Sequence, residues 1–426
     1  MVIEKDMSQS LLEKDSTNTV RRINITDTFS ALHYPNYRLW FFGQMISLMG
    51  TWMQSTAQGF LVFQLTQSPV YLGYVGFASG VPAWLFTLYG GFIADRVQRR
   101  TLLIITQTTM MILAFVLAGL TFSGMVQPWH IIVLAFLLGV ANAFDAPARQ
   151  AFVLEMVPRE ALTNAVALNA TMFNTGTAFG PAIAGITYAM FGPAWCFMIN
   201  AISFIAVIAA LAMMKLIPSP IDRSQKSVLQ GIREGYRFVR SDVIVRTLIL
   251  YLAAVSLFGM GFATLMPDWA VKILGGDATT NGLLQSARGI GALIGALLTA
   301  ALSRMELRGR LVTWGSFLFP AMLIVFGLIH WLPLSLLVLV IVGISQIIYM
   351  NNSNSLVQTE TPDLLRGRVL SIYTLAFFGL VPVGSLLVGA LAAAIGEMNT
   401  LLLGAALLFL CAVWMRLKVP QIWQST

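Results

Sequence analysis

Apolar stretches of roughly 20 residues recur along the whole chain, and they constrain the fold more than any other feature. A helix of that length crosses the roughly 30 Å hydrocarbon layer of a membrane and satisfies its own backbone hydrogen bonds there. Because 57% of the 426 residues are hydrophobic, the segments between the stretches are short. We therefore predict an all-α membrane protein with twelve transmembrane helices, at residues 39–64, 71–94, 101–123, 128–147, 164–190, 195–216, 245–270, 281–302, 311–331, 333–353, 369–394 and 398–418.

The longest polar connection divides these stretches into two sets of six. We expect two pseudo-symmetric six-helix bundles at 38–216 and 245–418, joined by a central cytoplasmic loop at 217–244. Residues 1–37 form a polar N-terminal arm, and residues 419–426 form a C-terminal tail. The arm has no apolar core of the length that a cleavable signal peptide requires.

Positive charges gather on one side of the predicted helices. Of the 26 Lys and Arg residues, all but Lys272 and Arg288 lie in or directly beside the arm, the tail and the connections that follow even-numbered helices. Cytoplasmic loops carry such an excess, so we expect a multi-pass plasma-membrane protein with both termini in the cytoplasm. The net charge of +8 then reflects topology in the lipid bilayer, and no nucleic-acid partner is expected.

The two halves also repeat each other in sequence. Repeats of this kind build many secondary transporters, whose substrate site lies near the midplane between the halves. One constant, gapless shift aligns Pro158 with Pro362, Gly180 with Gly384, Gly185 with Gly389 and Gly192 with Gly396.

A clump of charges, GGFIADRVQRR at 90–100, connects the second and third predicted helices. It resembles the signature of the major facilitator superfamily at Gly91, Asp95, Arg96, Arg99 and Arg100, while Gln98 replaces a glycine. Stretches at 37–69, 143–158 and 162–169 look like the branch of enterobactin-exporter-like secretion transporters. The resemblance covers residues 34–418, and it implies the major facilitator fold with no cofactor.

In this superfamily the loop belongs to a cytoplasmic latch, so the resemblance implies a latch at the five matching residues. We expect Arg96 to pair with Asp145 near the inner end of the fourth helix, with Arg149 one turn further on. A contact of this kind can form and break as one half rocks against the other. The alternative is that Arg99 and Arg100 only anchor the topology, although an anchor has no use for the acid of the loop.

The fifth predicted helix contains GTAFGPAIAG, in which Gly176, Gly180, Pro181 and Gly185 are similar to the superfamily's antiporter signature. Small residues at this spacing allow close helix packing, and proline bends a helix. The resemblance implies export, whereas ordinary helix packing would explain the same pattern without it.

Amide side chains are spaced along the first predicted helix and recur in the fourth, fifth and tenth. An unpaired amide is costly in lipid, so these side chains face another helix or water. Hydrogen bonds between helices and a substrate cavity are both possible for a single amide, and the whole set favours a cavity. The expected substrate path contains Gln54, Gln58, Asn142, Asn174, Arg288, Gln346 and Asn351.

Arg288 lies inside the eighth predicted helix, where a charge costs about 3 kcal/mol or more unless it is paired or hydrated. Three interpretations of Arg288 remain open at this point. It contacts an anionic part of the substrate, it pairs with Asp268, or it extends its guanidinium to the membrane surface. Proton coupling needs a group that changes charge, and Asp145 is the candidate because no Asp or Glu lies deeper in a predicted helix.

The sequence thus predicts a monomeric secondary active transporter that exports a small amphipathic molecule by alternating access, coupled to protons. The substrate class (siderophore, drug or secondary metabolite) is implied by the resemblance. Alternatives are a nutrient importer or lysolipid flippase of the same fold, and a membrane-embedded sensor or enzyme. No phosphate loop and no metal-ligand spacing is present, so neither ATP hydrolysis nor a metal site is expected.

Overall fold

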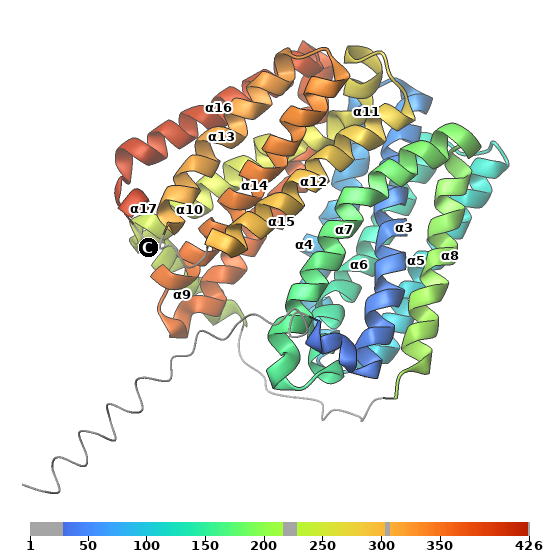
Figure 1. The fold of residues 1–426 in the computed structure, drawn as a ribbon, viewed down its shortest axis with the longest axis horizontal. Helices are drawn as coiled ribbons and strands as arrows, with labels where there is room; N and C mark the ends of the chain where they lie inside the picture. The colour runs from blue at the N-terminus through green and yellow to red at the C-terminus, as the bar shows by residue number, and fades with distance from the viewer. Residues whose placement is uncertain (1–28, 216–227, 303–306, 425–426) are drawn as a thin grey trace, which may run out of the picture.

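The computed structural model describes residues 29–215, 228–302 and 307–424, and the regular elements within these ranges are all helices (Figure 1). They are η1 (Ser30–His33), α3 (Pro35–Thr66), α4 (Pro69–Ala94), α5 (Arg99–Phe122), α6 (Pro128–Met156), α7 (Arg159–Phe191), α8 (Pro193–Met213), α9 (Val228–Ser241), α10 (Val243–Ala254), η2 (Val255–Gly259), η3 (Gly261–Leu265), α11 (Met266–Asp268), η4 (Trp269–Ile273), α12 (Ala278–Leu302), α13 (Arg308–Leu328), α14 (Leu332–Glu360), α15 (Asp363–Ile395), α16 (Glu397–Lys418) and α17 (Gln421–Gln424).

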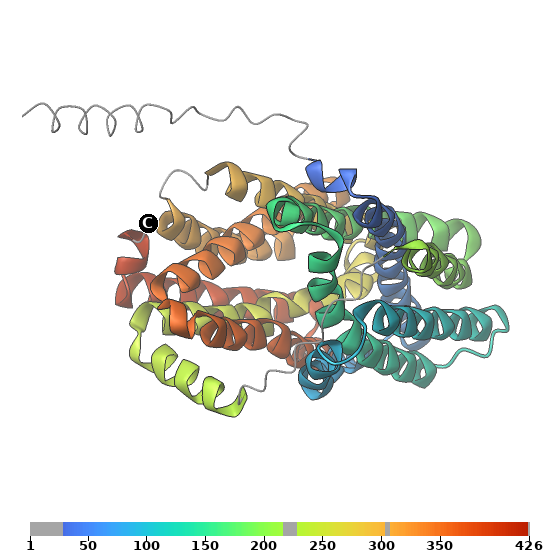
Figure 2. The same cartoon turned by 90° about the horizontal axis from the view of Figure 1, so that it is seen from below.

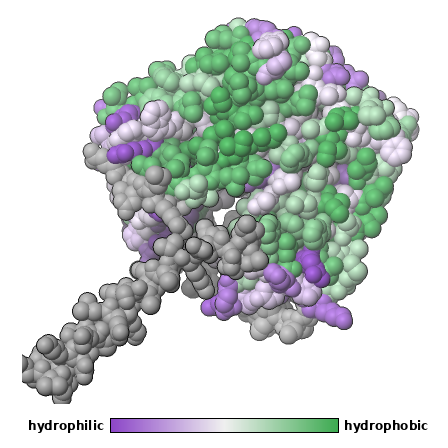
Figure 3. Space-filling view, in the orientation of Figure 1, coloured by the Kyte–Doolittle hydropathy of each residue, from purple (hydrophilic) through white to green (hydrophobic). Residues whose placement is uncertain are grey.

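Ten segments of the described chain are long and apolar enough to cross a membrane. The two long helices outside this set, α3 and α7, carry the amide and hydroxyl side chains that lower their hydropathy. Figure 3 shows a broad hydrophobic surface across the middle of the molecule, with hydrophilic residues toward its ends. An all-helical protein with many membrane-crossing segments is therefore confirmed.

Helices α3 to α8 pack together in an N-terminal half, and helices α9 to α17 pack together in a C-terminal half. Each half has its own buried apolar clusters, which are contributed almost entirely by its own helices. Figures 1 and 2 show the two halves side by side. The chain therefore forms an interface between these two groups of helices.

The sequence repeat has a structural counterpart in α7 and α15, which are both 33 residues long. Each begins directly after a proline, Pro158 or Pro362. Each ends at a glycine with positive φ, +87° at Gly192 and +86° at Gly396. Glycine adopts this conformation without the steric penalty that other residues meet, so the aligned prolines and glycines fix equivalent helix boundaries.

The halves touch mainly through two helix pairs, α7 with α12 and α4 with α15, and the glycines of these helices allow the contact. A Cβ atom at Gly185 would lie 2.8 Å from the carbonyl oxygen of Ala278, and one at Gly389 would lie 2.7 Å from that of Pro69. These contacts occupy the end of the molecule where α7 ends and α12 begins. We call it the far end, and we call the opposite end, which bears the α4–α5 corner and α9, the basic end.

The seventh predicted helix is not continuous. Between Val243 and Ile273 the chain forms α10, a π turn (η2), a 3-10 turn (η3), the short α11 and a second π turn (η4). Gly261 lies against the backbone of Gly384 in α15, and Pro267 lacks the amide hydrogen that a regular helix would use. This span therefore approaches its neighbours closely at the expense of regular hydrogen bonding.

The central connection differs from the expected loop, because it contains the helix α9. Its apolar residue Val239 is buried, while Arg237 and Arg240 are exposed, so the helix is strongly two-faced. Arg368 of α15 forms an ion pair with Glu234 of α9, which holds this helix across the basic end of the C-terminal half. The prediction missed it because a surface helix contains too few apolar residues to register as a span.

Candidate functional site

The corner between α4 and α5 lies at the basic end with its charges open to solvent. The side chain of Asp95 is 66% exposed, and the guanidinium of Arg96 lies over the ring of Phe92, 3.7 Å from the ring centroid. A Cβ atom at Gly91 would meet no atom within 4 Å. Figure 3 shows the molecule hollowed between the two halves at this end. Among the described residues, Asp95 forms an ion pair only with Arg99 of the same half, whose Nη2 lies 3.9 Å from its Oδ1.

Arg99 and Arg100 join α5 to its neighbours within the N-terminal half. Nη1 of Arg99 lies 2.7 Å from Oε1 of Glu155 in α6. Nη2 of Arg100 donates a hydrogen bond of 2.6 Å to the carbonyl oxygen of Ala212 at the end of α8. In this conformation both arginines brace the helices of one half.

Asp145 is buried and turned toward α5. Its Oδ1 accepts hydrogen bonds from the hydroxyl of Thr106 at 2.8 Å and from Nε2 of Gln107 at 2.9 Å, while its Oδ2 lies 3.5 Å from Nε of Arg149. The expected ion pair between Asp145 and Arg96 is not formed. The reason is that α5 offers two polar donors to the carboxylate inside the half, and these replace a partner from the corner.

The antiporter-like motif of α7 lies where that helix meets two others. Cβ atoms at Gly176 and Gly180 would lie 2.9 Å and 2.6 Å from Trp52 of α3. A Cβ atom at Gly282 in α12 would overlap the carbonyl oxygen of Pro181, so the same motif also packs against the other half. The motif therefore joins α3 to the far-end contact of the two halves.

Two of the predicted path residues are bonded inside their own halves. Nδ2 of Asn200 in α8 donates a hydrogen bond of 2.7 Å to Oε1 of Gln54, and Nε2 of Gln346 contacts the sulfur of Met260. These contacts match the alternative in which the amides join helices.

The other amides of the predicted path differ in exposure. Asn142 of α6 and Asn351 of α14 are exposed, Asn174 is half-buried, and Gln58 is buried. Within the described ranges, no hydrogen bond joins any two residues of the predicted path. The structure thus leaves Asn142 and Asn351, one from each half, as the amides that are accessible from outside the helix packing.

Arg288 of α12 has no anionic partner among the described residues. Its Nε atom is buried without a hydrogen bond, and its guanidinium carbon lies 6.0 Å from the ring centroid of Phe262. The alternative of a structural pair with Asp268 is wrong, because Asp268 binds Lys272 instead.

Asp268, Lys272 and Glu397 form a compact charged cluster at the far end. Nζ of Lys272 lies 2.9 Å from Oδ1 of Asp268 and 2.6 Å from Oε1 of Glu397 at the start of α16. Asp268 is completely buried, and Glu397 is 13% exposed. Among the described residues, no group of His, Cys, Asp or Glu side chains is arranged to hold a metal ion.

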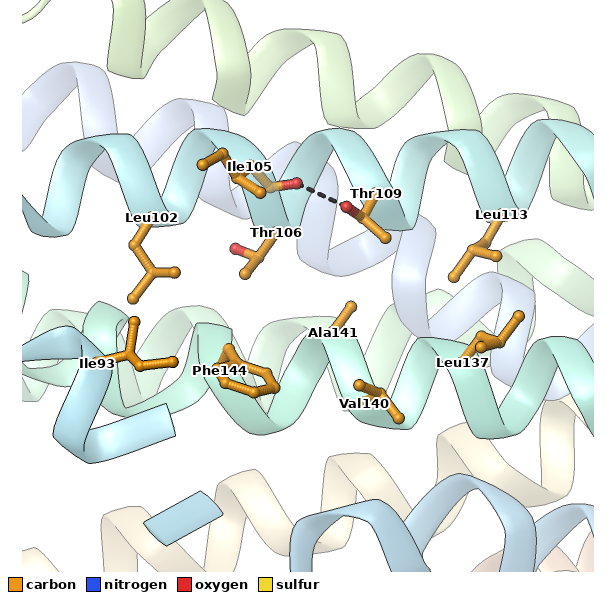
Figure 4. A pocket seen from close by; sticks show the side chains of 10 residues that line it. All are labelled: Ile93, Leu102, Ile105, Thr106, Thr109, Leu113, Leu137, Val140, Ala141 and Phe144. Atoms are coloured by element: carbon orange, nitrogen blue, oxygen red, sulfur yellow. Dashed lines mark hydrogen bonds between the residues drawn. The ribbon is translucent and has the colours of Figure 1, made fainter. Parts of the chain in front are cut away.

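A groove of about 410 Å³ lies between α5 and α6, beside the end of α4 (Figure 4). Its wall is apolar except for two threonines, and Ile105 and Leu137 on its rim are exposed. Figure 4 shows Leu102 and Thr106 of α5 and Ala141 of α6 pointing into the space between the two helices. None of the predicted path residues lies on its wall, so the groove is separate from the interface between the halves.

The family profile described as transmembrane secretion effector matches residues 26–425. The chain belongs to this family.

Three curated relatives of this secretion effector are transporters. The staphyloferrin A transporter of Staphylococcus aureus is 27% identical over 368 residues, which are 85% of this chain and 91% of that protein. The multidrug efflux pump Tap of Mycolicibacterium fortuitum is 30% identical, over 87% of this chain and 94% of the pump. The enterobactin exporter EntS of Shigella flexneri is 26% identical, over 84% and 86%. The secretion effector is therefore a multi-span membrane transporter of the major facilitator superfamily and not an enzyme, which confirms the branch expected from the sequence.

The fold agrees with this placement. The crystal structure of the nucleoside transporter NupG superposes with a TM-score of 0.69 at 14% identity, and the match covers 92% of this chain and 99% of NupG. At that identity the match supports only the fold of this chain and not its function.

The sequence analysis did not predict the roles of several residues at these sites. Gly90, next to the signature glycine, is the one that packs against the backbone of Ala143 in α6. Thr106 and Gln107, which hold Asp145, are polar positions inside an apolar stretch, and that contrast is a usable signal. The partnership of Lys272 with Glu397 leaves no local signal, because the two residues belong to different helices far apart in sequence.

Proposed function

We propose that this transporter exports a small amphipathic molecule by alternating access, driven by proton antiport. The observation that carries the proposal is the unequal contact between the halves, which meet at the far end and leave a hollow at the basic end. A transporter whose halves rock about a central site passes through this conformation and through its reverse. Membership of a family with siderophore and drug exporters supports the outward direction.

The proposed topology has twelve spans in two six-helix bundles, 38–216 and 245–418, of a monomeric plasma-membrane protein. The arm 1–37, the connection 217–244 and the tail 419–426 are placed in the cytoplasm with the basic end. Residues 1–28, 216–227 and 425–426 of these segments lie outside the described residues. The distribution of Lys and Arg supports this orientation.

The proposed substrate is an amphipathic molecule with an anionic group, of the siderophore, drug or secondary-metabolite class. Arg288 supports the anionic group, because a guanidinium that is half-buried and has no protein carboxylate is stabilised when a ligand supplies the negative charge. Asn142 and Asn351, exposed on helices of opposite halves, are proposed to line the same path.

We expect Arg288→Gln to reduce export of an anionic siderophore by roughly 10- to 100-fold, which is the loss of one charge-assisted hydrogen bond. Export of the cationic dye ethidium should change less than threefold, since it gains nothing from the guanidinium. The matched control is Arg310→Gln, which removes an exposed arginine at the basic end. Equal loss for both probes would contradict the anion-binding role.

Proton coupling is proposed to use Asp145, which is one of only two buried carboxylates among the described residues. Its partners Thr106 and Gln107 can donate to the charged form, and a change of proton state there would alter the contact between α5 and α6.

The test is accumulation of ethidium and of an anionic siderophore in inverted membrane vesicles with an acidic lumen. Export with proton antiport predicts uptake that collapses when a protonophore is added, and Asp145→Asn should lose most of the response to the pH gradient. Asp363→Asn, at an exposed carboxylate of α15, should retain it. Uptake that ignores the protonophore would remove proton antiport, and uptake only in right-side-out vesicles would point to an importer.

A further inference from the structure

The far-end cluster brings two carboxylates to one ammonium group. Asp268 of α11 and Glu397 of α16 are both within ion-pair distance of Nζ of Lys272, at 2.9 Å and 2.6 Å. With both acids ionised the cluster carries one excess negative charge, and Asp268 is completely buried. Burial of an uncompensated charge is strongly unfavourable, so two neighbouring acids, one of them fully buried, tend to hold a proton between them even though Lys272 is 38% exposed.

Among the described residues, no other charged side chain relieves this excess. The turn η4 contributes Lys272, and α16 contributes Glu397. The only charged residue of α12 is Arg288, and it forms no ion pair with Asp268. From α3 the facing residues are Gly59 and Phe63, which are uncharged.

The cluster lies where the two halves close over each other at the far end. A Cβ atom at Gly59 of α3 would lie 3.7 Å from Cγ of Pro267, the neighbour of Asp268. Nζ of Lys272 lies 5.6 Å from the ring centroid of Phe63, which also belongs to α3. If the halves part at the far end, α3 moves away from this surface and the cluster becomes open to the solution on that side.

We propose that Asp268, Glu397 and Lys272 form a proton-binding site that takes up one proton when the far end is open and keeps it when the far end closes. The proposal rests on the proton antiport proposed above and assigns a second group to it, on the opposite end from Asp145. The proton neutralises the cluster, and only the neutral cluster is buried at low cost. Proton uptake from the outer solution therefore favours closure of the far end.

The test measures far-end closure in the purified full-length transporter as a function of pH, with protons as the only added ligand. Spin labels are attached at Ser123→Cys and His330→Cys, which lie in exposed far-end loops of opposite halves, after Cys196 and Cys411 have been replaced by alanine. The distance distribution between the labels is recorded by pulsed electron paramagnetic resonance from pH 5 to pH 9, a window of about four decades in proton activity. One proton changes the closure equilibrium by up to about tenfold per pH unit.

We expect the far-end-closed population to increase as the pH falls. Asp268→Asn should stay closed across the whole range, because the amide is neutral at every pH, and Glu397→Gln should behave in the same way. Lys272→Gln should make closure depend more steeply on pH, because without the ammonium both acids must be protonated before the cluster is neutral. A merely structural brace would instead weaken closure at every pH when Lys272 is replaced.

Asp277→Asn is the matched control, since Asp277 is an exposed far-end acid and asparagine also serves as a helix N-cap. This variant should keep the pH dependence of the unmodified protein. The proposal is overturned if closure does not depend on pH, or if both Asp268→Asn and Glu397→Gln keep the unmodified dependence. Its failure is distinguishable from failure of proton antiport, because the vesicle assay would still show a response to the protonophore.

Discussion

The two ends of the molecule are held by different kinds of contact. At the far end, glycines bring α7 against α12 and α4 against α15, so that backbone meets backbone across the halves. At the basic end, Figure 3 shows a hollow between the halves, and the corner of the N-terminal half carries the exposed charged side chains of Asp95 and Arg96. Close backbone packing depends on shape, whereas an ion pair near solvent depends on charge and screening. The comparison teaches that opening the two ends should respond to different substitutions.

The largest effect is expected from Gly282→Val in α12, where a Cβ atom would overlap the carbonyl oxygen of Pro181. Overpacking of this kind costs about 1–3 kcal/mol, which is roughly a 5- to 150-fold shift toward the far-end-open state. The far-end spin-label distances measure it directly. Gly119→Val in α5 is the control, because a Cβ there meets nothing within 4 Å, and an equal response from both variants would contradict the packing argument.

A smaller effect is expected from Asp95→Asn at the basic end. The latch at this corner is expected to form an ion pair near solvent when the basic end closes, and such a pair contributes about 1 kcal/mol or less. Closure of the basic end should therefore weaken by up to about fivefold, and the far-end-closed population should increase. Labels at Glu160→Cys and Leu364→Cys, exposed at the start of α7 and α15, report the distance. Loss of the effect at high salt is expected as well, and an effect as large as that of Gly282→Val would break the comparison.

The smallest effect is expected from Glu234→Gln, which removes the ion pair between α9 and Arg368. Both side chains are substantially exposed, at 54% and 40%, so the pair contributes between about 0 and 1 kcal/mol. Thermal unfolding in detergent should shift by less than about 2 °C, and neither label pair should change its distance distribution. A large change in either distance would show that α9 takes part in closure.

Much of the fold could be predicted because membrane spans are set by local hydropathy. The paired helix ends at Gly192 and Gly396 were also readable, since a positive φ favours glycine wherever it occurs. The partners of buried charges were not readable. Asp145 accepts hydrogen bonds from Thr106 and Gln107 because α5 lies beside it in the fold. The spacing of residues in the sequence does not show which helix will be the neighbour.

The irregular span between Val243 and Ile273 has a mechanical consequence. Two π turns flank the short piece from Gly261 to Asp268, and each widens the normal hydrogen-bond ladder, as in the 2.7 Å bond from the amide of Met260 to the carbonyl oxygen of Val255. A segment with an irregular π turn on either side rotates at a lower free-energy cost than a continuous helix of the same length. The segment from Gly261 to Asp268 can therefore rotate locally before the C-terminal half tilts as a whole. Amide hydrogen exchange would be fastest at the two π turns, η2 and η4.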